Sequence, residues 1–469
     1  MASSNSRLSQ RIFRKLNLQE YTYDRANDYD FLFVISALLL RCKAELSKDI
    51  VHEALQCLLK QHPLFRATII TERDQDCKES GRYYVEMENG GSVNLHTSDL
   101  TVDEIEAAMS LERKRPLASP DGHLWRCTLL RGQWVESAIG AAEEYNAGVI
   151  LSMRHSSADG LSVVRYADLL IENINNILNK TLSAKTCRVE KTAFPRPLED
   201  ILGVQTAEKS EQEPSVTHMY DLKSCFRQVD VNDSVDQANS KFLLLEIPDY
   251  VTSNMNKLSK ERGANLNGAL MVVICLSYIK VATDGKPIDY GAFPLAFSVS
   301  LRRYFEKGGA NSLGCYDTIM ISEIGIHRVS FEVEGFWKLA HQLTQDIHKE
   351  LGNKTPLLYL DQSSYDEFLK QIIGKFENRA EYLANSSNFH VSNYGRLDFL
   401  KRHKHSLVSF DSIYSMVAGA TSDFQISILG LDNKLYITIL YETEIIKGDK
   451  AEAFKNEIMR MLEQISNTK

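Results

Sequence analysis

A histidine and an aspartate four residues apart are the side chains of this sequence best placed for acid–base chemistry. His155 closes an alternating apolar run over residues 149–155, and Gly160 comes directly before an apolar helical pattern. A strand end beside a helix start is a natural rim for a cleft. Histidine is the side chain best suited to accept and return a proton near neutral pH. Asp159 could hold an arginine and so fix the loop that aims the imidazole.

Two ordinary structural roles compete with this interpretation. Asp159 could cap the helix that begins at Leu161, because a carboxylate there accepts hydrogen bonds from the first helical N–H groups. His155 could be a hydrogen-bonded histidine of the core. The spacing H-x-x-x-D-G, taken alone, leaves both roles open.

Strands and helices alternate around this segment in the first part of the chain. Residues 149, 151, 153 and 155 share one face of a strand, and an apolar stripe runs along a helix over residues 161–178. Ser47 can cap a helix that Pro63 stops. The patterns also predict strands over residues 31–41, 64–70 and 124–130 and a helix over residues 103–111.

The last part of the chain repeats this mixture. A strand over residues 293–301 alternates cleanly, and Asn267 can cap an apolar helix over residues 268–279. Further strands are predicted over residues 242–247, 389–395, 407–418, 424–429 and 435–441, and further helices over residues 248–263 and 449–464. We therefore predict two α/β lobes, 1–180 and 238–469, joined by a crossover linker over residues 181–237.

Composition narrows the class of protein. The 469 residues carry 54 Lys and Arg against 62 Asp and Glu, and the formal charge of −8 argues against a nucleic-acid partner. The longest apolar runs, 31–40 and 269–279, are shorter than the roughly 20 residues of a membrane-spanning helix. Eight scattered cysteines without a CxxC pair favour reduced thiols over disulfides or a metal site. We expect a cytoplasmic protein.

Two basic segments have alternative interpretations. The N-terminal stretch places basic residues among apolar ones, at Arg7, Arg11, Arg14 and Lys15. It could touch a membrane or lipid-droplet surface. A lead-in to the first strand is the plainer interpretation. Residues 401–405 (KRHKH) predict a solvated basic loop in preference to a metal or anion site.

The segment around His155 resembles the signature of the chloramphenicol-acetyltransferase-like superfamily, which includes alcohol O-acetyltransferases, plant BAHD acyltransferases and condensation domains of peptide synthetases. Four further stretches resemble segments of that family, in the expected order over nearly the whole chain. They are LLKQHPLFRA at 58–67, IPDYVTSNMNKLSKERGANLNG at 247–268, SVSLRRY at 298–304 with NSLGCY at 311–316, and SNYG at 392–395.

The resemblance implies two α/β lobes that meet at a central tunnel. It implies that His155 is the general base and that Asp159 and the adjacent Gly160 are structural, with Asp159 paired to an arginine of the second lobe. Arg302 is the best position for that arginine, and Arg303 is the alternative. Backbone N–H groups near Gly160 and the Asn393 side chain are candidate oxyanion donors, and Ser392, Asn393 and Gly395 are candidate substrate or oxyanion residues. Lys257, Lys260 and Arg262 are candidates for binding CoA.

Two departures from the family pattern bear on the substrates. Condensation domains usually carry two adjacent histidines, and Arg154 stands at the first of these positions. The late DFGWG motif of the BAHD group is replaced by SNYG at 392–395. Both departures favour the alcohol acetyltransferase branch.

The expected function is therefore acyl-CoA-dependent O-acyl transfer to an alcohol. Acyl-CoA would be a co-substrate, and no bound cofactor or metal is expected. The alternatives are an amide-forming enzyme that uses a carrier-bound thioester, or a catalytically silent ligand-binding homologue. The protein is expected to be a monomer, because the two lobes complete one site.

Overall fold

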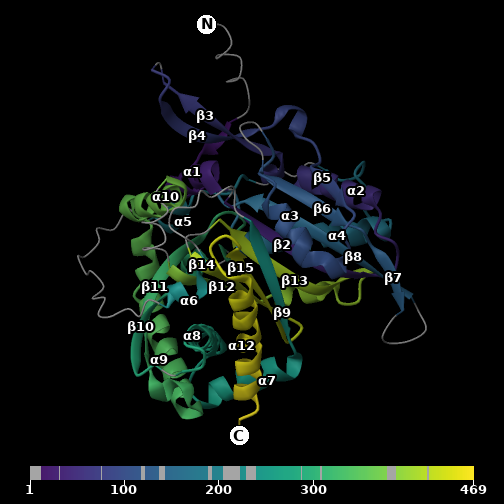
Figure 1. The fold of residues 1–469 in the computed structure, drawn as a ribbon. Helices are drawn as coiled ribbons and strands as arrows, with labels where there is room; N and C mark the ends of the chain where they lie inside the picture. Colours follow the sequence, from purple (N-terminus) through teal and green to yellow (C-terminus); the bar gives the residue numbers. More distant parts are fainter. Residues whose placement is uncertain are drawn as a thin grey trace. The chain divides into compact units, whose positions relative to one another are not determined.

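The computed structural model describes residues 12–30, 32–74, 76–117, 122–136, 143–188, 193–203, 222–228, 239–286, 288–306, 309–377, 387–419 and 422–468. The chain divides into two compact units (Figure 1). Unit 1 comprises Met1–Gln205, Arg302–Tyr316 and Phe399–Gly419, and unit 2 comprises Thr206–Leu301, Asp317–Asp398 and Ala420–Lys469.

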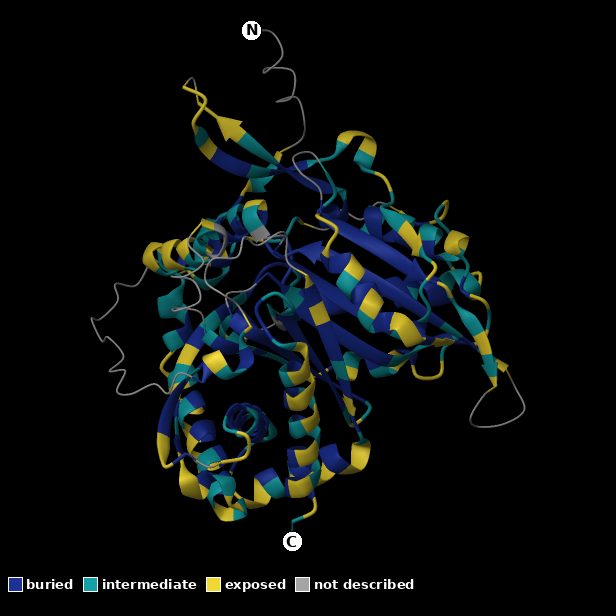
Figure 2. Cartoon of the chain, viewed as in Figure 1, coloured by how far each residue is buried: buried dark blue, intermediate teal, exposed yellow. Residues whose placement is uncertain are grey.

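The main sheet of unit 1 holds the strand that ends at the candidate histidine. Its order is β13-β2-β8-β6-β5, and β7 adds to β8. The bounds are β13 Val408–Ala418, β2 Phe33–Cys42, β8 Glu143–Arg154, β6 Trp125–Leu130, β5 Leu95–Ser98 and β7 Gln133–Glu136. All pairs are antiparallel except β5 with β6. The central strands are almost entirely buried (Figure 2), so the end of β8 is rigidly positioned.

Helices and a second, smaller sheet complete unit 1. Helix α4 packs on α2 and on strands β13, β2 and β8, while α3 packs on β2 and β8. The smaller sheet has the order β1-β4-β3, with antiparallel pairs. The bounds are α1 Leu18–Asp30, α2 Lys48–Gln61, α3 Ile105–Arg113, α4 Gly160–Leu178, α5 Leu198–Leu202, β1 Ile12–Lys15, β3 Ala67–Arg73 and β4 Glu79–Glu86.

Unit 2 is built on a six-stranded mixed sheet of order β11-β10-β12-β14-β15-β9. Helix α8 is buried almost all round and packs against α9, α12 and α7 (Figure 2). The bounds are β9 Ser240–Ile247, β10 Tyr290–Ser300, β11 Asp317–His327, β12 Ser387–Arg396, β14 Ser422–Leu431, β15 Lys434–Glu442, α6 Lys223–Phe226, α7 Asp249–Glu261, α8 Leu266–Ala282, α9 Val333–Gly352, α10 Gln362–Glu377 and α12 Gly448–Ser466.

Most of the predicted elements are present, with three local corrections. The stretch from Pro63 to Arg66 forms a 3₁₀ turn, so the strand begins only at Ala67. Asn265, and not Asn267, caps α8, because its side chain accepts the N–H of Gly268. Strand β10 ends at Ser300, and Arg302 lies in the following 3₁₀ turn Leu301–Tyr304. The sequence patterns did not predict β1, α1, β4, β5, β7, α5, α6, β11, α9 or α10.

The two units do not follow a single cut in the sequence. The predicted second lobe, 238–469, contains residues 302–316 and 399–419, yet both segments pack in unit 1. Strand β13 pairs with β2 along its length, and Arg302 binds Asp159. Much of the predicted linker, and Arg7 and Arg11 of the basic N-terminal stretch, lie outside the described residues. Arg14 and Lys15 lie in β1.

Among the described residues, no single helix has the length and apolar composition to cross a bilayer. Helices α7 and α8 meet those criteria only as a pair, bent by 108° at their junction.

Candidate active site

His155 lies immediately after β8, the strand at the centre of the unit 1 sheet. Its backbone N–H donates to the Leu32 carbonyl at 3.2 Å, which extends the pairing of β8 with β2 past the strand end. The residue is only 5% exposed. Its ring packs against the Tyr23 ring of α1, with centroids 4.6 Å apart. The backbone of His155 and one face of its ring are therefore both held in place.

The turn after His155 is fixed by short hydrogen bonds. Ser157 Oγ donates to the Arg154 carbonyl at 2.7 Å, and the Tyr84 hydroxyl donates to the Ser156 carbonyl at 2.7 Å. Burial raises the pKa of the Tyr84 phenol, so it remains a proton donor. His155 Nδ1 lies 3.3 Å from the Ala158 carbonyl oxygen. A proton on Nδ1 would satisfy that carbonyl and leave the Nε2 lone pair as the base.

Arg154, the residue before His155, is held by a buried ion pair. Its Nη1 lies 2.8 Å from Oδ1 of Asp24 on α1, and Asp24 is 1% exposed. Arg82 of β4 contacts the other oxygen of Asp24 at 2.5 Å. Arg154 therefore links the end of β8 to α1 and the smaller sheet. Sequence reasoning missed this pair, because Asp24 lies in a polar helix that has almost no apolar stripe.

Asp159 fills two roles at once. It caps α4, since Oδ1 accepts the Ser162 N–H at 2.8 Å. It also forms a buried ion pair with Arg302, whose Nη1 lies 2.7 Å from Oδ2 and whose Nη2 lies 3.2 Å from Oδ1. The Tyr316 N–H donates to Oδ2 at 2.8 Å. With its oxygens surrounded by donors, Asp159 is suited to hold structure and not to exchange protons.

The segment that carries Arg302 closes around α4 through Ser162. Ser162 Oγ donates to the Gly314 carbonyl at 2.8 Å and contacts Arg302 Nη2 at 2.7 Å. Arg302 Nε donates to the Ser312 carbonyl, and the guanidinium lies 5.2 Å from the Tyr316 ring centroid. We call Asp159, Arg302, Ser162 and Tyr316 the clamp. Arg303, the alternative partner, is exposed.

Cys315 is a further site residue that sequence reasoning missed. It is 1% exposed, and its Sγ lies within 4.8 Å of a ring nitrogen of His155. Its place in the 311–316 segment, directly before the clamp residue Tyr316, is the one signal that could have identified it.

The predicted SNYG segment lies on β12 in unit 2. Asn393 Nδ2 donates to Asn267 Oδ1 at 2.7 Å, and Asn393 Oδ1 accepts the Gly395 N–H at 2.9 Å. Gly395 has φ +71°, a left-handed conformation that glycine adopts without strain, and a β-bulge lies between it and Asn393. Ser392 Oγ contacts Ser298 Oγ at 3.0 Å. These bonds fix the orientation of the Asn393 amide within unit 2.

The three candidate CoA cations lie on the exposed C-terminal part of α7 and just beyond it. Lys257 lies 3.9 Å from Glu261, and Arg262 lies 3.0 Å from Glu334. These carboxylates reduce the local positive charge that an anionic donor would meet, and Lys260 is exposed beside them.

The basic stretch 401–405 is not the solvated loop that its composition predicts. His403 is 4% exposed, and its Nε2 lies 2.8 Å from Oδ1 of Asp168 on α4. Arg402 donates to both oxygens of the same carboxylate, at 3.0 and 2.9 Å. Arg402, Lys404 and His405 are exposed as predicted, and the prediction fails at His403. Its partner Asp168 is far away in sequence and links α4 to the segment that leads into β13.

No known family's sequence pattern matches this chain, and no curated protein is similar to it in sequence. Solved structures nevertheless share its fold. The TRI3 trichothecene 15-O-acetyltransferase from Fusarium sporotrichioides superposes with a TM-score of 0.69 at 12% identity, over 97% of this chain and 95% of that chain. Polyketide synthase associated protein 5 from Mycobacterium tuberculosis gives 0.60 at 14% identity, over 97% and 98%. The first condensation domain of the calcium-dependent antibiotic synthetase, in complex with a substrate analogue, gives 0.63 at 13% identity, over 97% of each chain.

These comparisons establish the fold class. The chain has the mixed α/β architecture that an O-acetyltransferase and a peptide-synthetase condensation domain share, and the fold predicted from the resemblance is confirmed. The central tunnel stays a prediction.

Proposed function

We propose that this protein is an acyltransferase in which His155 is the general base for direct transfer of an acyl group from acyl-CoA to an alcohol. The observation that carries the proposal is the buried imidazole at the end of β8, directly before the turn that leads into α4. The clamp fixes that turn, because both carboxylate oxygens of Asp159 accept hydrogen bonds from the other clamp residues. A histidine with a purely structural role would not need a buried ion pair to fix the turn that follows it.

In this mechanism Nε2 of His155 takes the proton of the acceptor hydroxyl as its oxygen attacks the thioester carbonyl. The C–O bond forms and the carbonyl π electrons move to oxygen, giving a tetrahedral oxyanion. Collapse re-forms the carbonyl and breaks the C–S bond. The leaving thiolate receives the proton from the imidazolium, which restores the neutral base. No covalent acyl-enzyme is required.

The oxyanion needs preorganised donors. The first N–H groups of α4 follow Asp159, and helix-start N–H groups have no partner within their own helix. Gly160 provides one of these groups. The oriented Asn393 amide is the second candidate. Asp159 would contribute only by holding the loop.

The residue at position 154 favours an ester-forming function over an amide-forming condensation. In the condensation alternative a second histidine would stand at this position, but Arg154 is committed to the buried Asp24. The predicted acyl donor is therefore CoA and not a carrier protein.

The test is thiol release from acetyl-CoA and longer acyl-CoAs with a panel of alcohols and amines. The wild type should release thiol only with an alcohol, and His155→Ala should lower the rate by about 10²–10⁴-fold. His405→Ala is the matched control, because His405 is an exposed histidine of unit 1. Amide formation only from an acylated carrier protein would overturn the alcohol assignment. Absence of turnover with every donor would indicate a silent binding homologue.

A further inference from the structure

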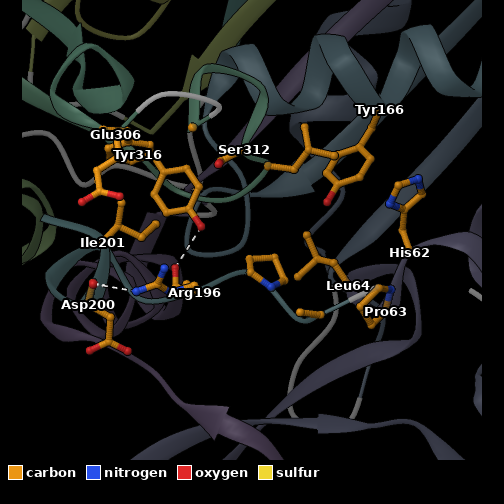
Figure 3. Close-up of a pocket in the computed structure, with 15 residues that line it drawn as sticks. His62, Pro63, Leu64, Tyr166, Arg196, Asp200, Ile201, Glu306, Ser312 and Tyr316 are labelled. Atoms are coloured by element: carbon orange, nitrogen blue, oxygen red, sulfur yellow. Dashed lines mark hydrogen bonds between the residues drawn. The ribbon is translucent and has the colours of Figure 1, made fainter. Parts of the chain in front are cut away.

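A cavity of about 550 Å³ lies within unit 1 (Figure 3), and neither His155 nor the turn after it is among the described lining residues. One wall is formed by the 3₁₀ turn Pro63–Arg66 and helix α4. The others come from residues 193–201, 305–306 and 309–316. Its volume lies within the range of roughly 300–1,000 Å³ that is usual for small-molecule sites.

Two neutral polar side chains lie together on the first wall. The Tyr166 hydroxyl points into the cavity (Figure 3), and the residue is only 1% exposed. Within the described part of the chain, no hydrogen-bond partner of that hydroxyl is present. The His62 ring packs edge-on against Tyr166, with centroids 5.5 Å apart. A hydroxyl that faces the cavity can pair with a hydrogen-bonding group of a ligand.

Both groups are uncharged at neutral pH. Burial lowers the pKa of His62 to about 4, and the nearby Arg66 adds to this effect. Burial also raises the pKa of Tyr166 well above its usual range. A neutral imidazole and a phenol can each donate or accept a hydrogen bond. They match a hydroxyl or carbonyl group and offer nothing to compensate a buried charge.

The remaining lining divides into an apolar interior and a charged rim. Pro63 and Leu64 are buried beside Tyr166. Among the described lining residues, Asp200, Glu306 and Arg196 are exposed, which gives two carboxylates and one guanidinium. This rim disfavours an anionic ligand such as CoA. The cavity therefore fits an amphipathic molecule with a hydrocarbon body and a hydroxyl head.

The wall formed by residues 193–201 is held in place. Arg14 Nε donates to the Pro195 carbonyl at 2.7 Å, and the rings of Phe13 and Phe194 stack with centroids 4.6 Å apart. The Tyr316 hydroxyl donates to the Arg196 carbonyl at 2.9 Å (Figure 3). The cavity is thus bounded by fixed backbone on this side.

The cavity also touches the clamp behind the motif. Tyr316 and Ser312 line it. The backbone N–H of Tyr316 binds Asp159, and the Ser312 carbonyl accepts from Arg302. A molecule in the cavity would pack against the residues that fix the Asp159 carboxylate.

We propose that this cavity is a second ligand site, distinct from the His155 site, for a neutral hydroxyl-bearing amphipathic molecule. The hydroxyl binds Tyr166 and His62, and the hydrocarbon body lies on Leu64 and Pro63. Occupancy stabilises the clamp. This site does not depend on catalysis by His155.

The test uses geraniol as a neutral probe and geranic acid, an anion at pH 7, as its charged counterpart. The readout is the His62 ring signal in the NMR spectrum of the full chain with isotope-labelled histidine, assigned with His62→Gln. Geraniol should shift this signal with saturation, and geranic acid should bind at least tenfold more weakly. Tyr166→Phe should weaken geraniol about five- to tenfold, the worth of one hydrogen bond. Tyr145→Phe, at a tyrosine on β8 outside the cavity, should change nothing.

A second variant keeps the test independent of Tyr166. Ala193 is an exposed lining residue, and Ala193→Trp should reduce geraniol binding by partly filling the cavity, whereas Ala193→Ser should not. His155→Ala should bind geraniol as the wild type does, whether or not the wild type transfers acyl groups. Absence of a His62 shift, equal affinity in Tyr166→Phe, or loss of binding in His155→Ala would each overturn the proposal.

Discussion

Removal of the Asp159 carboxylate is the perturbation that best tests the clamp. In Asp159→Ala, Arg302, which is 6% exposed, loses its carboxylate partner and keeps its contacts with Ser162 Oγ and the Ser312 carbonyl, both neutral. Breaking a buried ion pair from one side costs about 3–5 kcal/mol, and loss of a helix cap costs about 1 kcal/mol. The sum is comparable with the whole stability of many domains, about 5–15 kcal/mol. We expect unit 1 to lose most of its stability.

Amide hydrogen exchange measures this effect locally. Protection in α4 should fall by about a thousandfold or more, since each 1.4 kcal/mol is about tenfold. Helix α12 of unit 2 is the internal reference. Ser47→Ala is the matched control, because Ser47 caps α2 in unit 1 without any ion pair, and it should cost only about 1 kcal/mol.

A double-variant cycle separates the ion pair from the cap. Asp159→Asn keeps an oxygen for the Ser162 N–H, and Arg302→Gln removes the guanidinium. The double variant should be less destabilised than the two single effects together, because neither charge is then left buried alone. Additive effects, or α4 protection in Asp159→Ala no lower than in Ser47→Ala, would refute the reasoning.

Three further outcomes follow from buried groups of unit 1. Lowering the pH from 7 to 5 should destabilise unit 1 by about 2 kcal/mol, because the His62 pKa of about 4 lies below its ordinary 6.5 and the unfolded chain therefore gains the proton first. This stability is lost as the pH falls through 6.5. His62→Asn should therefore flatten the dependence of melting temperature on pH. Arg154→His should lower the melting temperature without creating amide-forming activity in a carrier-thioester assay, since Asp24 loses a partner. Asp168→Ala should cost about 1–3 kcal/mol and speed amide exchange in β13, because buried His403 loses its acceptor while Arg402, 42% exposed, is largely solvated; unchanged exchange would contradict a binding role for Asp168.

Local patterns were sufficient where a segment depends on its own residues. The alternating run before His155 predicted the end of β8, and the apolar stripe over residues 161–178 predicted α4 nearly to its bounds. The strands predicted over residues 424–429 and 435–441 are β14 and β15, and the turn that joins them holds Asp432 and Asn433, both with positive φ. Each is a case in which periodicity or turn chemistry acts over a few neighbouring residues.

Local patterns failed where a distant partner decides the conformation. The KRHKH stretch is polar throughout, and nothing within it indicates that His403 is buried against Asp168. Helix α1 has almost no apolar stripe, yet it supplies Asp24 to Arg154. A polar residue that is buried by a partner more than a hundred positions away leaves no periodic signal in its own segment.

By itself the sequence determined the elements with clear periodicity, the acidic balance and the position of the H-x-x-x-D-G segment at a strand-to-helix junction, because these depend on residue type and short-range spacing. Tertiary structure alone decided that Asp159 both caps α4 and binds Arg302, since that second role requires a guanidinium 143 residues away. It also decided that Tyr166 and His62 face one cavity, which depends on the path of residues 193–201, 305–306 and 309–316. Long-range packing creates both sites, and short-range pattern carries no information about it.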